Sequence, residues 1–179
     1  MFSLNPKVDD LVERYAVQGI DGVKIMVLGT IKAPGSGCFC PESSLLKNLM
    51  SYLVLEDEHI VILDMEAGLE HLGRSTVRSV DVLLVVVEPG RRSVETAVRI
   101  TEMGRSLGVG KVLAVLNKVS DDAQEAELRS LLDEGGIGTA AVIRYDAGLI
   151  SGDLAGRPTV SPAAEGAITG LVEMIIDGL

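Results

Sequence analysis

A short run of aliphatic residues, 60–63, ends on an acid, Asp64, and such a run restricts how the surrounding chain can fold. A strand of a parallel sheet has both faces covered by helices, so it reads as unbroken aliphatics and delivers its next polar residues to the carboxyl edge. Open α/β sheets bind ligands at that edge. A carboxylate there can hold Mg²⁺, and a glycine just beyond it, here Gly68, can bring a backbone N–H against a phosphate. Many buried strands also stop at Asp, so residue 64 alone leaves a structural and a ligand-binding role open.

The same kind of segment recurs along the whole chain and alternates with helical spacing. Strands are predicted at 23–31, 59–64, 81–88, 111–116 and 140–145. Helices are predicted at 42–55, 70–79, 91–107, 121–133 and 162–176. We expect residues 1–22 to be an extended lead-in and the glycine-rich stretch after residue 145 to be a loop. This alternation predicts an α/β fold, a parallel β-sheet flanked by helices, formed as a single domain over residues 1–179.

Composition narrows the classes of partner. Of the 179 residues 47% are hydrophobic and only 3% aromatic, which allows one domain with an aliphatic core. The formal net charge of −10 argues against a nucleic-acid backbone or an anionic membrane as the main partner. The sequence has no apolar segment long enough to span a bilayer, and its first residues lack the pattern of a signal peptide. We therefore expect a cytoplasmic protein with no nucleic-acid partner and no membrane span.

The two cysteines, Cys38 and Cys40, lie one residue apart in a loop rich in Gly, Ser and Pro. Thiolates are soft ligands for Zn²⁺, Ni²⁺, Cu(I) or an iron–sulfur cluster. A closed tetrahedral thiolate site needs four sulfurs, so a metal held in that way must be shared by two chains across a symmetry axis. The alternative is that both thiols are small buried hydrophobes, although the flanking residues are typical of a surface loop.

A phosphate-binding loop of the form G-x-x-x-x-G-K-[ST] is absent from the sequence. Residues 108–111, read GVGK, resemble half of one, but the lysine begins a predicted strand instead of a helix. We therefore dismiss them as a phosphate-binding loop: residues 108–110 end the helix before them, and Lys111 begins the next strand.

Four segments together resemble a known family: GTIKAPGSGCFCPESSLL, ILDMEAGLEHLGR, DVLLVVVEPGRRSVETA and LNKV. They are similar to the CooC-type maturation ATPases, the nickel-insertion accessory proteins of carbon monoxide dehydrogenase, which belong to the MinD/ParA-like deviant P-loop NTPases. The resemblance covers essentially all of the chain, and the CxC loop together with D-M-E-A-G-x-E-H-L-G-R makes it specific.

The resemblance implies a role for individual residues. Cys38 and Cys40 would bind nickel or zinc between the two subunits of an ATP-controlled homodimer, and carbon monoxide dehydrogenase would be the client. Asp64 would be the Walker B-like acid near Mg²⁺, and Gly68 the switch residue near the γ-phosphate. Asn117, in the Asn-Lys pair, would read the adenine base.

The sequence departs from the family in lacking its first strand and its G-K-G-G-x-G-K-T loop. Without that loop the phosphates lose their backbone N–H cradle and lysine, so we expect weakened binding of ATP and Mg²⁺ and no hydrolysis by this chain alone. A separate polypeptide that carries the P-loop would restore the pocket. Two further interpretations stay open: a fragment of an active ATP-hydrolysing metallochaperone, and a non-catalytic scaffold or dimerisation module. We also expect strand 60–63 either to close onto strand 82–87 or to leave a gap beside it.

Overall fold

The computed structural model describes residues 12, 14–27, 60–65, 80–157 and 161–178. The chain divides into two compact units, Met1–Ser79 and Val80–Leu179, and each is described here by itself. None of the described helices has the length and apolar character needed to cross a membrane.

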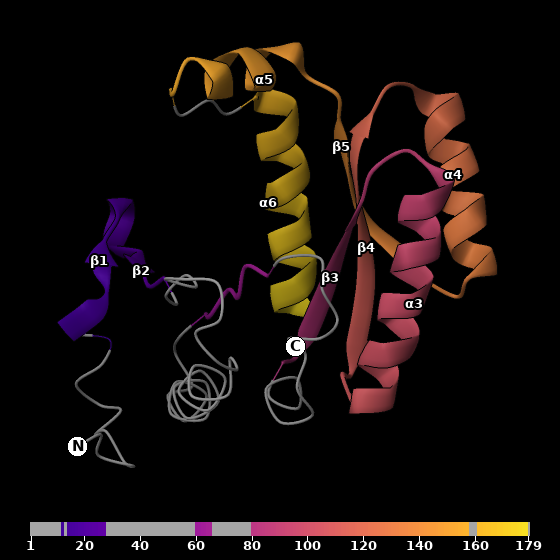
Figure 1. Ribbon diagram of the computed structural model, residues 1–179, viewed down its shortest axis with the longest axis horizontal. Coiled ribbons are helices and arrows are strands. Elements are labelled where there is room, and N and C mark those ends of the chain that lie inside the picture. The colour runs from indigo at the N-terminus through magenta and orange to yellow at the C-terminus, as the bar shows by residue number, and fades with distance from the viewer. Residues whose placement is uncertain (1–11, 13, 28–59, 66–79, 158–160, 179) are drawn as a thin grey trace, which may run out of the picture. The chain divides into compact units, whose positions relative to one another are not determined.

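The second unit is built on three parallel strands, β3 (Val82–Val87), β4 (Lys111–Val119) and β5 (Gly138–Arg144), in the order β3-β4-β5 (Figure 1). Each strand is rich in aliphatic residues because both of its faces can be covered. The central strand β4 is the most buried, and Ala114, Leu116 and Val119 are completely inaccessible to solvent. The parallel α/β sheet flanked by helices is therefore confirmed.

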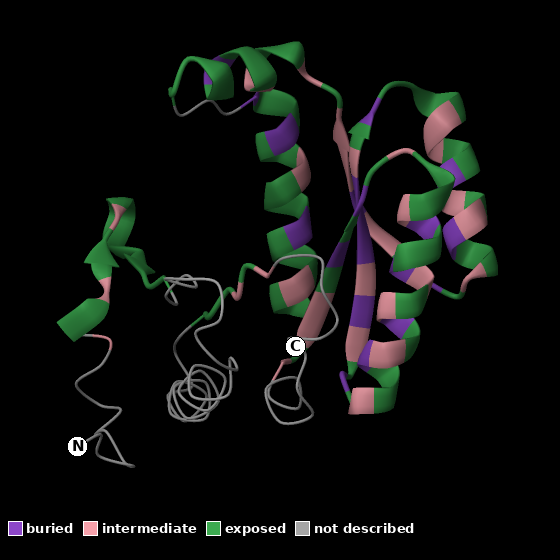
Figure 2. Ribbon diagram, in the orientation of Figure 1, coloured by how far each residue is buried: buried purple, intermediate pink, exposed green. Residues whose placement is uncertain are grey.

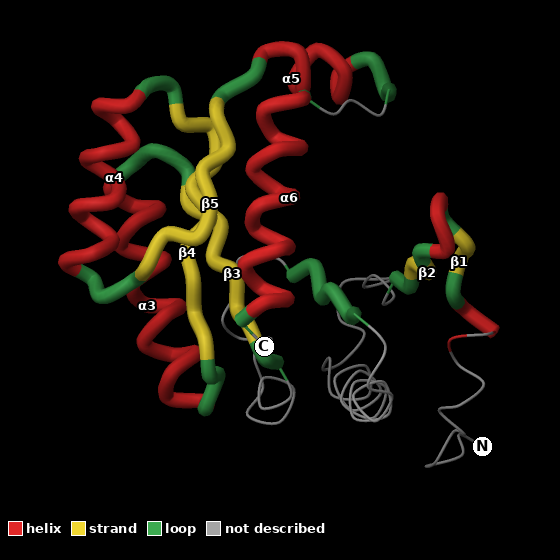
Figure 3. The backbone as a smooth tube through the Cα atoms, turned by 180° about the vertical axis from the view of Figure 1, so that it is seen from behind, coloured by secondary structure: helices red, strands yellow, loops and turns green. Residues whose placement is uncertain are grey.

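Helices cover the two faces of this sheet unequally. Helices α3 (Arg91–Leu107) and α4 (Asp122–Glu134) lie on one face, and α6 (Pro162–Asp177) lies on the other, against β5 (Figures 1 and 3). Leu171 of α6 packs on Val115 and Ala141 of the sheet. On β3, Val87 is fully buried, whereas its neighbour Val86 is 61% exposed. Figure 2 shows that buried residues lie along the sheet and on the helices that cover it. No described strand pairs with the outer edge of β3.

The predicted elements of this unit agree closely with the structure. Helix α3 has the predicted bounds and is followed by Gly108, which takes a left-handed φ of 90°. Lys111 begins β4, as predicted. The predicted loop after residue 145 is wrong, because Ala147–Leu154 forms helix α5. Its first turn is stabilised by Asp146, whose Oδ1 accepts a hydrogen bond from Gly148 N–H at 2.7 Å. The glycines of this stretch favoured a loop in the prediction, although the helix begins with a side-chain cap.

The first unit differs more from prediction. Its described part contains two-residue strands, β1 (Val17–Gln18) and β2 (Lys24–Ile25), which pair antiparallel around a 3₁₀ turn, Ile20–Gly22. A long parallel strand at 23–31 is therefore wrong for residues 24–27, and residues 28–31 lie outside the described part. The turn has positive φ values at Asp21 and Gly22. It reverses the chain, so that β2 pairs with β1, the strand directly before it in the sequence, instead of with a distant strand.

The predicted strand 59–64 is also wrong where the structure describes it, because residues 60–65 have no regular secondary structure. Ile60 and Ile62 are 77% and 87% exposed. A strand is stabilised by hydrogen bonds to a neighbouring strand and by burial, and no described residue pairs with this segment. The predicted helices 42–55 and 70–79 lie outside the described residues.

Candidate functional site

The carboxyl ends of the three parallel strands bring polar residues to one edge of the second unit. Glu88 directly follows β3, Asn117 and Lys118 lie at the end of β4, and Tyr145 and Asp146 follow β5. This is the edge at which open α/β sheets bind ligands. Asn117 is half-buried, while Glu88, Lys118 and Tyr145 are exposed, so the edge is accessible in this unit.

Local geometry fixes the side-chain amide of Asn117. Its Oδ1 accepts a hydrogen bond from the backbone N–H of Lys118 at 3.0 Å. The Nδ2 group of the amide can then donate to a ligand. Asn117, the residue predicted to read the base, therefore lies at the edge where open α/β sheets bind ligands, and its Nδ2 group is a hydrogen-bond donor.

Lys118 connects the ends of two strands. Its Nζ lies 2.5 Å from Oε1 of Glu88, and both side chains are about half exposed, at 51% and 53%. The backbone N–H of Glu88 donates to Ser93 Oγ of α3 at 3.1 Å. The end of β3, the start of α3 and the end of β4 are thus joined by polar contacts.

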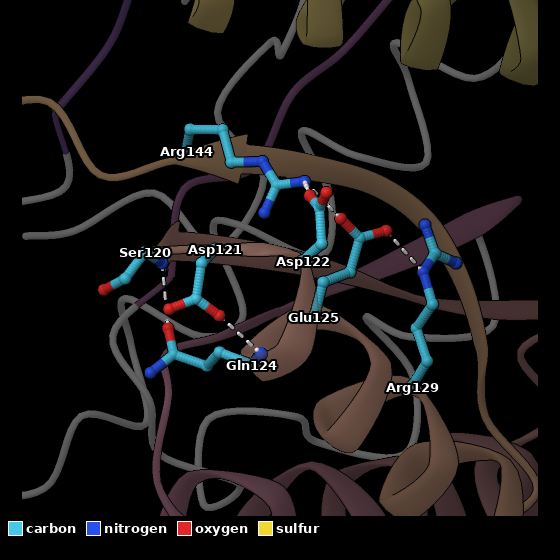
Figure 4. Close-up of polar contacts among 7 residues, drawn as sticks. All are labelled: Ser120, Asp121, Asp122, Gln124, Glu125, Arg129 and Arg144. Atoms are coloured by element: carbon cyan, nitrogen blue, oxygen red, sulfur yellow. Dashed lines mark hydrogen bonds and ion pairs between the residues drawn. The ribbon is translucent and has the colours of Figure 1, made fainter.

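The end of β5 is joined to α4 by charged side chains (Figure 4). One guanidinium nitrogen of Arg144, Nη2, contacts Asp122 Oδ1 at 2.6 Å and Glu125 Oε2 at 2.7 Å. The other carboxylate oxygen of Glu125 accepts from Arg129 Nε at 2.7 Å. The Arg144 guanidinium is therefore engaged by two carboxylates of α4, and we assign it a structural role at the end of the strand.

The predicted site residues fall in different parts of the chain. Asp64 is exposed and belongs to the first unit, whereas Asn117 belongs to the second. Cys38, Cys40 and Gly68 lie outside the described residues, so their roles stay predictions. Within the described part of the chain, no group of three or more His, Cys, Asp or Glu side chains is arranged to hold a metal ion.

Sequence reasoning missed the contribution of Glu88. Its position as the acid that closes an aliphatic run was visible, because the same signal drew attention to Asp64. Its partner Lys118 is 30 residues away, and no spacing rule connects the two. Only the pairing of β3 with β4, which aligns Val87 with Leu116, brings them within reach.

Comparison with known proteins identifies relatives of this chain. It is 38% identical over 158 residues to an uncharacterised ATP-binding protein of Methanocaldococcus jannaschii, a match that covers 88% of the chain and 61% of that protein. It is 34% identical over 178 residues to the carbon monoxide dehydrogenase accessory protein CooC of Rhodospirillum rubrum, a match that covers 98% of the chain and 66% of that protein. The chain thus spans less than two thirds of either relative. No family model matches it.

Solved structures give the same fold. The cell division protein MinD of Aquifex aeolicus superposes with a TM-score of 0.65 over 97% of this chain and 75% of that chain, at 16% sequence identity. A MinC:MinD complex from the same organism superposes with a TM-score of 0.66 over 97% of this chain and 73% of that one. At this identity the likeness establishes a MinD-like fold.

Proposed function

Because this chain belongs to the family of CooC-like ATP-binding proteins with a MinD-like fold, we propose that it is part of a nucleotide-dependent maturation factor for a nickel enzyme. The enzyme to be matured would be a carbon monoxide dehydrogenase, the protein that the CooC relative is named for serving. The observation that supports this most is Asn117, whose amide donor lies at the ligand-binding edge of the parallel sheet.

For nucleotide binding we propose a separate role for each of the residues that the resemblance singles out. In this proposal Asn117 donates to the base, Asp64 holds Mg²⁺ directly or through water, and the backbone of Gly68 approaches the γ-phosphate. The sequence contains no G-K-G-G-x-G-K-T loop, so affinity for ATP is low and this chain alone does not hydrolyse it. The exposed carboxylate of Asp64 is free to reach a hydrated cation, which is compatible with this role.

The metal would be cargo, bound by the thiolates of Cys38 and Cys40. Each chain has only two cysteines, so a four-sulfur site for Ni²⁺ or Zn²⁺ requires a homodimer in which both copies contribute their pair. Such a site would load and release its ion as the two subunits approach and separate.

Metal titration under reducing conditions tests the proposal. We expect the full chain to bind one Ni²⁺ or Zn²⁺ per two chains and to elute as a dimer in the metal-bound form. The Cys38→Ala/Cys40→Ala variant should lose the metal, while Asn117→Ala, which leaves both thiols in place, should retain it. A wild-type chain that stays monomeric and metal-free would contradict the proposal, and a metal-free dimer would favour the scaffold alternative.

An ATPase assay of the isolated chain tests the second part. We expect no turnover above background, because the positioning groups of a phosphate-binding loop are absent from the sequence. Turnover that is lost in the Asp64→Asn variant would show instead that this chain is an active ATPase.

A further inference from the structure

The end of β4 carries an irregularity at the residues that face the candidate site. Pairing with β5 is interrupted between Leu116 and Val119, so Asn117 and Lys118 stand opposite one residue, Ile143. A bulge of this kind bends a strand and redirects its side chains, and it is often found beside binding sites. The direction in which Asn117 presents its amide therefore depends on the conformation of the bulge.

That conformation is unusual for the residue that adopts it. Lys118 has a φ of 59°, in the left-handed region, and among the described residues only one other non-glycine residue, Asp21, has a positive φ. A side chain with a Cβ is disfavoured there. Such a conformation persists when the surrounding contacts hold it in place.

Two contacts hold Lys118 in this conformation. Its backbone N–H donates to Asn117 Oδ1, and its ammonium group pairs with Glu88. The first contact is made by Asn117, the residue proposed to bind the base, so the second contact, the anchor, is the one that comes from outside the bulge. Glu88 is in turn attached to the first turn of α3 through its backbone bond to Ser93.

We propose that Glu88 is a positioning residue, whose ion pair with Lys118 holds the bulge in the conformation that directs the Asn117 amide toward the base of a bound nucleotide. The inference rests on the proposed nucleotide-binding function. In this proposal Glu88, which follows the neighbouring strand β3, contacts neither the base nor the phosphates and acts through Lys118.

The test combines Glu88→Ala and Glu88→Gln with a background in which Lys118 is replaced by Gly. Glycine adopts a φ near 60° without penalty, so the Lys118→Gly chain does not need the anchor. The matched control is Glu95→Gln, which removes another exposed ion pair, Arg91 with Glu95 at 3.6 Å, within α3. Thermal unfolding of each variant confirms that it is folded.

Two measurements on residues 1–179 are needed: the Cα chemical shift of Lys118 without nucleotide, and the dissociation constant for Mg·ATP. We expect Glu88→Ala to move the Lys118 shift and to weaken ATP binding by about twofold to fivefold, the range set by a half-exposed ion pair. Added salt should reproduce part of this loss in the wild type. In the Lys118→Gly background Glu88→Ala should have no effect, and Glu95→Gln should have none in either background.

An unchanged Lys118 shift in Glu88→Ala would overturn the inference, as would an equal loss of ATP affinity in the Lys118→Gly background. A wild-type chain that binds no ATP would overturn the proposed function instead. The Lys118 shift would then decide by itself whether Glu88 holds the bulge.

Discussion

At the scale of single residues, some polar side chains bond to neighbours in the sequence, and others bond to residues that are distant in the sequence. Asp121, Asp146 and Ser161 each precede a helix and accept a hydrogen bond from a backbone N–H two or three residues later. These caps satisfy donors that a helix start leaves unpaired, and residue type and position are enough to recognise them. The contacts of Lys118 and Arg144 span 30 and 22 residues, so they depend on how the strands are placed.

Replacement of the α4 cap provides a first prediction. Asp121 Oδ1 accepts from Gln124 N–H at 2.8 Å, while Gln124 Oε1 accepts from Ser120 N–H at 2.9 Å (Figure 4). We expect Asp121→Ala to lower the free energy of unfolding by about 1 kcal/mol, because the N–H of Gln124 loses its capping acceptor. Urea denaturation measures the change.

The conservative variant Asp121→Asn serves as the control, since asparagine caps helices about as well as aspartate. It should remain close to the wild type in stability. If the alanine and asparagine variants lose equal stability, the charge at this position matters more than the cap.

At the scale of elements, two glycines inside helices of the second unit have different surroundings. A Cβ added at Gly104 of α3 would lie 3.1 Å from Leu83 Cδ2 and 3.4 Å from Val112 Cγ2. A Cβ added at Gly170 of α6 would meet no atom within 4 Å. The glycine of α3 thus permits close helix–sheet packing, whereas that of α6 is exposed and only weakens its helix.

Alanine at these two positions should therefore have opposite effects. Gly170→Ala should raise the free energy of unfolding by about 0.5–1 kcal/mol through helix propensity alone. Gly104→Ala gains the same propensity but crowds the side chains of Leu83 and Val112, and we expect a net loss of about 1 kcal/mol. Paired denaturation curves decide the matter, and an equal gain at both sites would show that the contact of α3 with β3 is loose.

At the scale of the whole molecule, the two units differ in how much structure protects their backbones. Strand β4 has a partner on each side and contains most of the fully buried residues of the sheet. The β1–β2 pair has two residues per strand, and its apolar side chains, including Val17 at 68% and Ile25 at 51%, are exposed. Local stability should follow this difference.

Amide hydrogen exchange offers the corresponding measurement. We expect the slowest exchange at residues 112–116 of β4, approaching the rate of global unfolding, and exchange close to that of an unstructured peptide at residues 17–25. Comparable protection in both segments would contradict this expectation, because the exposed β1–β2 pair would then be as stable as β4.

The sequence alone determined much of the second unit. Unbroken aliphatic runs identified β3, β4 and β5, helical spacing identified α3, α4 and α6, and the resemblance to CooC-type proteins agrees with the relatives found. These patterns predict helices and strands correctly because each depends on residues that are close together in the sequence. Helix α5 was not predicted, because the glycines after residue 145 indicate a loop and the capping residue Asp146 was not taken as the start of a helix.

Tertiary structure decided the rest. Residues 24–27 and 60–65 have the composition of parallel strands, yet one segment forms a short antiparallel pair and the other has no regular structure. An aliphatic run becomes a strand only where a neighbour supplies hydrogen bonds, and a local pattern does not encode that neighbour. For the same reason the Glu88–Lys118 contact beside Asn117 became visible only once β3 and β4 were aligned in register.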